Sequence, residues 1–327
     1  MGGKKIRLRI NRWTPARRDL IFGRKIKHSL VQPHFVVAGQ NVDDPIQGMS
    51  GINRQSTDIL MQTIESDMKM GLTSHMIFLV MDDQMKDSTA SYASDHTSPL
   101  HNTVRLLKDR YGDDIVVMTD VCLCTGTDHG HCGIVKEERI ENDATVEELV
   151  KIGISHAKDG ADYISASDMM DGRILRLREE LDKHGFHSTG IMSYSVKYAS
   201  SFYGPFREAA DSSPEFGDRK SHQMDVRSGY SEAIMEALTD EKEGADIIMI
   251  KPGLPYLDVL RKVADAVNRP MAVYNVSGEY SMVMEGNRDI HKRERIIREI
   301  FNAFRRAGAD VIVSYHAREA ATHGWLE

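Results

Sequence analysis

The stretch Gly244-Ala-Asp-Ile-Ile-Met-Ile-Lys-Pro-Gly253 contains the pattern that decides the fold. In it, a glycine closes a charged segment, and a short, almost wholly apolar run follows. The same Gly-Ala-Asp turn occurs at residues 160–162 and 308–310, each time before another apolar run. Because one turn is reused, the chain is predicted to repeat a single helix-to-strand unit.

Short apolar runs followed by helical patterns occur eight times. Several of them lack polar alternation, which is typical of strands covered on both faces. Eight units in about 290 residues, without a linker or a break in composition, predict a closed (β/α)8 TIM barrel. We expect residues 31–327 to form this barrel, with residues 1–30 outside it. The runs are residues 35–38, 76–81, 115–121, 163–167, 189–193, 247–251, 271–276 and 311–315.

Helix start and stop signals support the alternation. Thr145 and Glu148 form a capping-box pattern, which predicts a helix start at this point. Pro99 suits the first position of a helix, and Gly112 marks the end of that helix. Apolar residues between 296 and 304 recur with a period near 3.6, which predicts one buried stripe.

Three long insertions, at residues 82–102, 122–143 and 198–229, follow the C-terminal ends of predicted strands. Active sites of such barrels lie at this end. The third insertion is rich in glycine, proline and serine, which favours a mobile flap over another helix. An ordinary surface loop remains the alternative.

A cysteine cluster lies in the second insertion. Cys122, Cys124 and Cys132 share a glycine-rich loop with His129 and His131. Thiolates bind soft divalent metals, and zinc is the default candidate. Three cysteines without a fourth leave one coordination position open, which is typical of a catalytic site. The alternative is that these are buried, reduced thiols with incidental histidines.

Two lysines end neighbouring units of the predicted barrel. Lys251 ends an apolar run, and Lys197 ends the unit before it. If their strands are adjacent, about 4.8 Å apart, both amines can enter one pocket. Burial and like-charge repulsion lower the pKa of a lysine and produce the neutral amine that attacks a ketone. A salt-bridged or snorkelling lysine is the alternative for either residue taken alone.

Composition and charge exclude several classes of protein. The net charge of -7 argues against a general nucleic-acid binder, although residues 4–27 contain ten Lys or Arg and one acid. No stretch is apolar and long enough for a membrane span, and the start lacks the apolar block of a signal peptide. Three clustered cysteines indicate a reducing compartment. We therefore expect a cytoplasmic protein that binds neither membranes nor nucleic acid.

Five motifs together resemble the porphobilinogen synthase family, also called 5-aminolevulinate dehydratase. The likeness extends over nearly the whole chain. The motifs are Asp120-Val-Cys-Leu-Cys124 with a later His-Gly-His-Cys-Gly, Ser167-Asp-Met-Met-Asp-Gly-Arg173, Lys197-Tyr-Ala-Ser-Ser-Phe-Tyr-Gly-Pro-Phe-Arg207, Met249-Ile-Lys-Pro-Gly-Leu-Pro-Tyr-Leu257 and Val276-Ser-Gly-Glu-Tyr280.

The resemblance implies a hydro-lyase of tetrapyrrole (heme and chlorophyll) biosynthesis. Such an enzyme condenses two molecules of 5-aminolevulinate to porphobilinogen with loss of two waters. It implies a Schiff base on Lys251 for the substrate that supplies the propionate arm, and one on Lys197 for the acetate arm. By the same likeness, Ser277 and Tyr315 hold the first carboxylate, Arg207, Lys220 and Gln223 hold the second, Asp120 and Ser167 contact substrate amine, and Tyr203 and Phe206 line the pocket.

The resemblance also implies metals and an assembly. Zinc would bind the three cysteines, while Asp128, in a segment that departs from the zinc-dependent pattern, leaves a Mg²⁺-tolerant site open. An allosteric Mg²⁺ would bind through Glu232 at a subunit boundary, although an acid in a first helical turn is also simply favourable. By the same likeness, residues 31–327 would be the catalytic barrel, and the basic residues 1–30 would be an extended N-terminal arm that wraps a neighbouring subunit of a homo-octamer.

Two other functions stay open at this point. One is a barrel aldolase that uses Lys251 alone, with a purely structural cysteine loop. The other is a metal-sensing or RNA-binding barrel that uses its basic arm.

Overall fold

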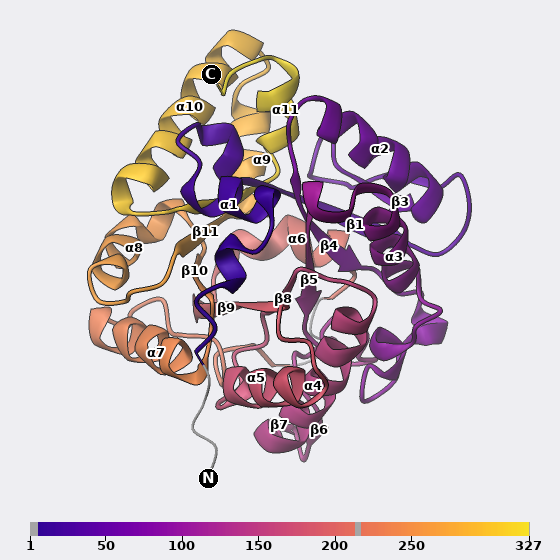
Figure 1. Cartoon of the computed structure of the whole chain (residues 1–327). Coiled ribbons are helices and arrows are strands. Elements are labelled where there is room, and N and C mark those ends of the chain that lie inside the picture. The colour runs from indigo at the N-terminus through magenta and orange to yellow at the C-terminus, as the bar shows by residue number, and fades with distance from the viewer. Residues whose placement is uncertain (1–5, 213–216, 327) are drawn as a thin grey trace.

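The computed structural model describes residues 6–212 and 217–326, and eight parallel strands form a closed barrel at its centre (Figure 1). Each strand pairs with the next, and the last pairs with the first through Leu30 and Ile312. All eight predicted runs are strands of this barrel, so the predicted fold is confirmed. The strands are β1 (Leu30–Val37), β4 (Ser74–Leu79), β5 (Val116–Val121), β8 (Tyr163–Ala166), β9 (Gly190–Lys197), β10 (Ile247–Lys251), β11 (Met271–Asn275) and β12 (Val311–Ser314).

Two short hairpins were not predicted. β2 (Asp43–Pro45) and β3 (Asn53–Ser56) pair with each other, and β3 also lies along β1. β6 (Val135–Lys136) and β7 (Arg139–Ile140) form a hairpin inside the insertion after β5. These strands have two to four residues, which is too short for a periodic signal in the sequence.

Helices surround the barrel. The main ones are α2 (Thr57–Lys69), α3 (Pro99–Tyr111), α4 (Asn142–Lys158), α5 (Arg173–Lys183), α7 (Tyr230–Glu243), α8 (Leu257–Ala264), α9 (Ser277–Gly286) and α10 (Ile290–Ala307). The other α-helices are α1 (Pro15–Phe22), α6 (Gly204–Ala209) and α11 (Ala317–Thr322). Single 3-10 turns occur at η1 (Ile10–Arg12), η2 (Ile26–Ser29), η3 (Asp83–Met85), η4 (Ser91–Ser94), η5 (Gly112–Asp114), η6 (Ser201–Tyr203) and η7 (Leu254–Tyr256). Among the described residues, no helix is long and apolar enough to cross a bilayer.

The predicted helix signals are confirmed with one exception. Pro99 begins α3, and Gly112 ends it with a φ of +52°. The buried face of α10 includes Ile297 and Phe301, as the stripe predicted. The capping box at Thr145 is wrong because α4 already begins at Asn142. The Thr145 hydroxyl instead accepts from the Ile134 N–H at 2.9 Å and ties the preceding loop to the helix.

The reused Gly-Ala-Asp turn has a precise structural role at the N-terminal end of the barrel. Each glycine has a φ between +100° and +115°, a conformation that side chains disfavour. Each aspartate then forms a reciprocal pair with one residue of the preceding strand. Its N–H donates to that residue's carbonyl, and its carboxylate accepts from that residue's N–H, all at 2.8–2.9 Å. The pairs are Asp162 with Val117, Asp246 with Ile191, and Asp310 with Met271.

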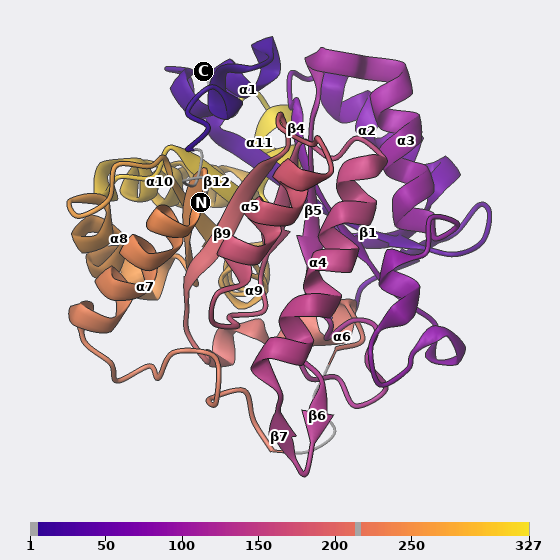
Figure 2. The same cartoon turned by 60° about the horizontal axis from the view of Figure 1, so that its bottom comes forward.

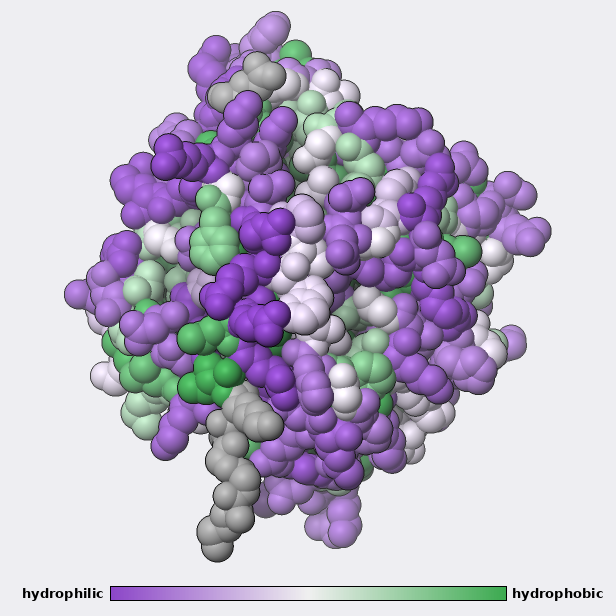
Figure 3. All heavy atoms as spheres, viewed as in Figure 1, coloured by the Kyte–Doolittle hydropathy of each residue, from purple (hydrophilic) through white to green (hydrophobic). Residues whose placement is uncertain are grey.

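Part of the predicted arm closes the same end of the barrel. Figure 2 shows α1 at one end of the barrel and α6 with the β6–β7 hairpin at the other. Arg17 donates to Asp162 at 2.8 Å, and Asn11 donates to the Asp246 carbonyl at 2.8 Å. Ile6 and Leu8 stay about 60% exposed, and Figure 3 shows an apolar patch in this region. Residues 1–5 of the arm and 213–216 of the predicted flap lie outside the described residues.

Candidate active site

The two lysines stand side by side at the C-terminal end of the barrel. In the pairing of β9 with β10, Lys197 is opposite Lys251, and each residue is only 5% exposed. The sequence predicted only that the two lysines end consecutive strands. The structure shows that both lie in one buried region. This is the geometry that the two-lysine prediction required.

A β-bulge in β9 creates this arrangement. Ser193 pairs with Ile248 and Val196 pairs with Ile250, so three steps along β9 oppose two along β10. Ile248 faces the surrounding helices, and so does Ser193 opposite it. With strict alternation, Lys197, four residues after Ser193, would also face away from the barrel interior. The extra residue restores the match, and Lys197 then faces the same side as Lys251. Bulges commonly re-aim side chains in this way beside active sites.

Aromatic rings enclose the amine of Lys251. Its Nζ lies 4.4 Å from the ring centre of Tyr274 and 5.0–5.2 Å from those of Tyr194, Tyr203 and Phe206. Burial lowers the pKa of Lys251 to about 7, and repulsion from Lys197 acts in the same direction. A large fraction of Lys251 is therefore a neutral nucleophile at neutral pH.

Lys197 faces the ends of β5 and β8. Its Nζ donates to the carbonyl oxygen of Ser167. Asp120, at the end of β5, has its pKa raised to about 6 by burial, while the charges of Lys251 and Lys197 and the Ser167 hydroxyl oppose the rise. One carboxylate thus lies within the field of both amines, where it can accept a proton or bind an ammonium group.

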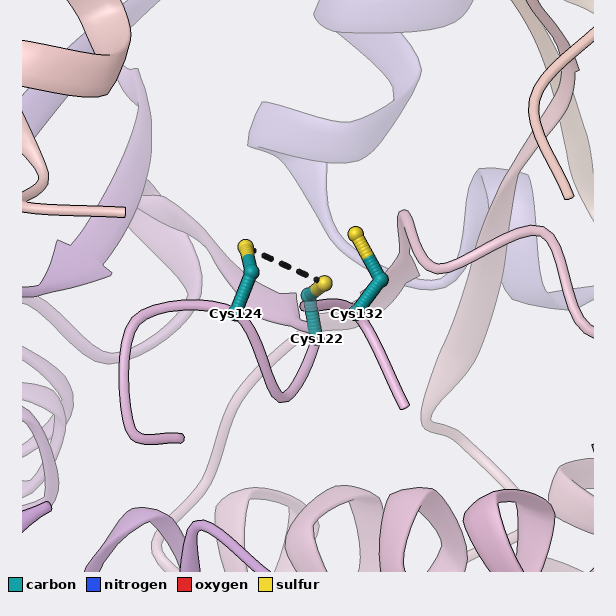
Figure 4. Close-up of side chains that lie close together, drawn as sticks. All are labelled: Cys122, Cys124 and Cys132. Carbon is teal, nitrogen blue, oxygen red and sulfur yellow. Dashed lines mark hydrogen bonds between the residues drawn. The ribbon is translucent and has the colours of Figure 1, made fainter. Parts of the chain in front are cut away.

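The three cysteine thiols gather beside this pocket, and Figure 4 shows their side chains turned toward one another. The Sγ atoms of Cys122, Cys124 and Cys132 all lie within 4.8 Å of one another, and those of Cys122 and Cys124 are 3.3 Å apart. All three residues are buried. Asp128 is not part of this ligand group, and its side chain is 59% exposed. Three convergent sulfurs fit a soft, tetrahedral metal and not a hard, oxygen-seeking one.

The three thiols shift one another's pKa values through hydrogen bonds. Hydrogen bonds from Cys122 and Cys124 lower the pKa of Cys132 well below its ordinary value, and Arg219 adds to this effect. In return, although burial opposes it, the nearby thiolate charge raises the pKa of Arg219. A lowered thiol pKa favours the thiolate form, which is the form that binds metals.

The residues predicted for the first carboxylate lie around Lys251. Tyr315 is buried, and its hydroxyl lies 3.0 Å from that of Tyr274. Ser277, at the start of α9, accepts from the Phe206 N–H at 2.9 Å. Tyr203 donates to the carbonyl oxygen of Lys251 at 3.2 Å. Strands β10, β11 and β12 and the base of the third insertion thus meet around one amine.

The residues predicted for the second carboxylate are divided. Gln223 is 2% exposed, and neither polar atom of its side chain has a partner among the described residues. Burial lowers the pKa of Arg207, with a smaller effect from Arg219. Lys220 does not join this group: its side chain is 64% exposed and pairs with Asp218 at 3.0 Å. Its neighbour Arg219 is 6% exposed and bonds the Gly130 carbonyl at 2.8 Å.

Glu232 lies elsewhere. It occupies the exposed first turn of α7 and lines a cavity of about 810 Å³ together with Asp171 and Glu236, but not with either lysine. Burial raises the pKa of Glu236 to about 7, and the nearby acids reinforce the rise. The lining of this cavity also includes Lys220 and Gln223, so the cavity at Glu232 borders the residues predicted for the second carboxylate.

Sequence reasoning named Tyr203 and Phe206 for the pocket but missed Tyr194 and Tyr274, which complete the aromatic enclosure of Lys251. It also did not show which of the cations Arg219 and Lys220 is buried. Adjacent cations such as Arg219 and Lys220 give no sign of which one turns inward. The tyrosines Tyr194 and Tyr274 alternate with apolar residues on their strands, so they look like ordinary core.

The fold and the pocket define a class: a (β/α)8 barrel with two buried lysines side by side and a cluster of three cysteines that could hold a metal ion. A family model described as "Delta-aminolevulinic acid dehydratase" matches residues 5–323. The chain belongs to the delta-aminolevulinic acid dehydratase family.

Named relatives agree with this assignment. The delta-aminolevulinic acid dehydratase of Methanothermus sociabilis is 46% identical over 90% of both chains. That of Bacillus subtilis is 41% identical over 96% of both. A crystal structure of the Toxoplasma gondii enzyme with its product porphobilinogen superposes with a TM-score of 0.88 at 40% identity, and covers 98% of this chain and 92% of that one. The chain is therefore a hydro-lyase of this family.

Proposed function

We propose that the chain condenses two molecules of 5-aminolevulinate to porphobilinogen, with Lys251 and Lys197 as the two covalent anchors. The observation that carries this proposal is the register of β9 and β10, which sets two buried lysines opposite each other. Each of two ketone substrates can be anchored by one of the two amines, whereas in an aldolase Lys197 would serve only to lower the pKa of Lys251.

The chemistry follows from the charges. The neutral amine of Lys251 attacks the ketone carbon of one substrate and releases one water as the Schiff base forms. Lys197 forms the second Schiff base with release of the other water. Carbon–carbon and carbon–nitrogen bonds between the two substrates then free both lysines. Asp120, with a pKa near 6, can accept the protons that these steps liberate.

Carboxylate binding sets the orientation of each substrate. Ser277 and Tyr315 are proposed to hold the carboxylate of the Lys251-bound molecule. Arg207 and Gln223 are proposed to hold the other, with Arg219 in the place first expected for Lys220. The buried cation of Arg219 and the buried, unpartnered amide of Gln223 favour this choice, because a carboxylate could bind both.

Zinc is the proposed metal at Cys122, Cys124 and Cys132. When bound, it would supply Lewis-acid polarisation of a substrate oxygen or nitrogen. The thiol geometry supports a soft metal, while Mg²⁺ at the cysteines has no support from Asp128. The chain's own contribution is to lower the pKa of the Cys132 thiol through hydrogen bonds from Cys122 and Cys124 and the charge of Arg219.

The remaining expectations concern assembly and regulation. We propose an allosteric Mg²⁺ at Glu232, a homo-octamer that uses the arm of residues 1–30, and a cytoplasmic location. The exposed apolar side chains of Ile6, Leu8 and Trp13 support a partner for the arm.

Trapping with borohydride tests the central proposal. Incubation with 5-aminolevulinate and reduction should label both Lys197 and Lys251, and porphobilinogen should appear in untreated samples. Label on Lys251 alone, without product, would favour the aldolase. Salt-dependent RNA affinity with no turnover would favour the RNA-binding barrel.

A further inference from the structure

One buried carboxylate links two loops of the pocket. Glu279, in the first turn of α9, is 2% exposed. It accepts hydrogen bonds from the backbone N–H groups of Gly253 at 3.3 Å, Leu254, and Val276 at 2.6 Å. The first two donors belong to the loop after β10, and the third belongs to the loop after β11.

These loops carry the two groups that would grip the first substrate. Lys251 is two residues before Gly253, and Ser277 directly follows Val276. Glu279 therefore bridges the strand that ends in the Schiff-base amine and the helix start that offers the carboxylate-binding hydroxyl. A single side chain can set the distance between these two groups.

The surroundings of the β10 loop leave little other freedom. A Cβ atom on Gly253 would lie 2.7 Å from the ring of Phe304 and 3.1 Å from the carbonyl oxygen of Tyr274. The loop is therefore in close contact with β11 and α10 on one side. On the other side, the Glu279 carboxylate accepts hydrogen bonds from the N–H groups of this loop.

Helix capping alone does not account for Glu279. A full capping box needs an acceptor on the N-cap side chain, and the N-cap here is Val276, which has none. Burial raises the pKa of Glu279 to about 7, against the opposing effect of its three N–H partners. A buried carboxylate is an unfavourable way to cap one helix, so its use indicates a further role.

We propose that Glu279 is a positioning residue that fixes Lys251 and Ser277 at the spacing of the ketone and the carboxylate of the first 5-aminolevulinate. This inference rests on the proposed function. Glu279 bonds nothing on β8 or β9 among the described residues, so the site of Lys197 should not depend on it.

The test is Glu279→Gln in the full-length protein, with Asp310→Asn as the matched control. Gln keeps the size of the side chain but replaces one acceptor oxygen with an amide donor. Asp310 accepts the N–H of Met271 at the opposite end of the same strand, β11, at 2.9 Å. Both variants thus remove one carboxylate that binds backbone N–H groups of the barrel, at opposite ends.

The readout is the rate of borohydride-trapped label at each lysine with 5-aminolevulinate, together with KM and kcat. Glu279→Gln should slow labelling of Lys251 by about tenfold or more and raise KM, because small misplacements of reacting groups are costly. Labelling of Lys197 should change less than about twofold. Asp310→Asn should leave both labelling rates and KM nearly unchanged. If Glu279→Gln does not fold, Glu279→Asp, which keeps the charge but shortens the reach, should give the same selective loss.

Equal slowing at both lysines, or unchanged labelling with only a lower thermal midpoint, would overturn the positioning role and leave the proposed function standing. Absence of label at both lysines of the parent protein would overturn the proposed function and this role with it.

Discussion

The two ends of the barrel use buried charge in opposite ways. At the N-terminal end, Asp162 pairs with Arg17 at 2.8 Å and Lys108 at 3.0 Å, and also binds a backbone N–H. At the C-terminal end, Lys251 and Lys197 face each other, with Asp120 as a shared counter-charge. At the N-terminal end, buried charges are paired and stabilise the fold. At the C-terminal end, two lysines share one carboxylate, and this incomplete pairing favours a reactive neutral amine.

The same contrast holds for polar groups. The Gly-Ala-Asp aspartates bond both backbone groups of a neighbouring strand. Near the lysines, the Gln223 amide and one oxygen of Asp120 are buried without a partner among the described residues. Buried polar groups without partners destabilise a fold unless a ligand satisfies them. Substrate groups can satisfy these atoms at the C-terminal end, whereas the carboxylates of the Gly-Ala-Asp turns are satisfied by the chain itself.

The largest expected effect comes from removing the proposed nucleophile, Lys251. Lys251→Met should lower kcat by about a thousandfold or more, because the covalent route is lost. The thermal midpoint should not fall, because Met fills similar space and the buried like-charge repulsion disappears. Activity and thermal unfolding are measured together, with Lys262→Met on the exposed face of α8 as control. Substantial residual activity would contradict the role of Lys251.

Next in size is the metal centre. Cys124→Ala should reduce bound zinc at least about tenfold, since the loss of a ligand exceeds the loss of an outer-sphere partner. Activity should fall in parallel. Asp128→Ala, at an exposed position in the same loop, should retain its metal. Metal analysis of the purified proteins decides the matter, and an unchanged zinc content in Cys124→Ala would refute the ligand assignment.

A change at the N-terminal end of the barrel should lower stability and leave kcat nearly unchanged. Asp162→Asn leaves Arg17 and Lys108 without their buried counter-charge, which should cost about 3 kcal/mol of stability. The midpoint of urea unfolding should fall, while kcat of the folded enzyme should stay within about twofold, since the site lies at the other end. A large loss of kcat at unchanged stability would break the contrast between the two ends.

The smallest expected effect is a shift in pH dependence. The rate of Schiff-base formation at Lys251 should rise as pH increases through about 7, because the neutral amine is the reactive form. Lys197→Met removes a like charge that lowers the pKa of Lys251, so the midpoint should move to higher pH. Asp120→Asn removes an opposite charge and should move it to lower pH. Trapping rates measured across neutral pH check both directions. An unchanged midpoint in Lys197→Met would argue against an electrostatic interaction between Lys197 and Lys251.

Much of the site was predictable because the motifs are contiguous. Cys122 and Cys124 are two residues apart and join Cys132 through one short loop, so their convergence needs little tertiary information. Strand-end lysines were predictable for the same reason. The Thr145 capping box failed because a nearby loop, and not the local pattern, determined where α4 begins.

The sequence by itself determined the eightfold alternation, the reused Gly-Ala-Asp turn and the two lysines on consecutive strands, because each depends on local periodicity or backbone conformation. Only the tertiary structure decided that a bulge in β9 turns Lys197 toward Lys251, that Arg219 and not Lys220 is buried, and that Glu279 joins two loops. These depend on register and packing between segments distant in the chain, and strand alternation carries no information about an extra residue in one strand.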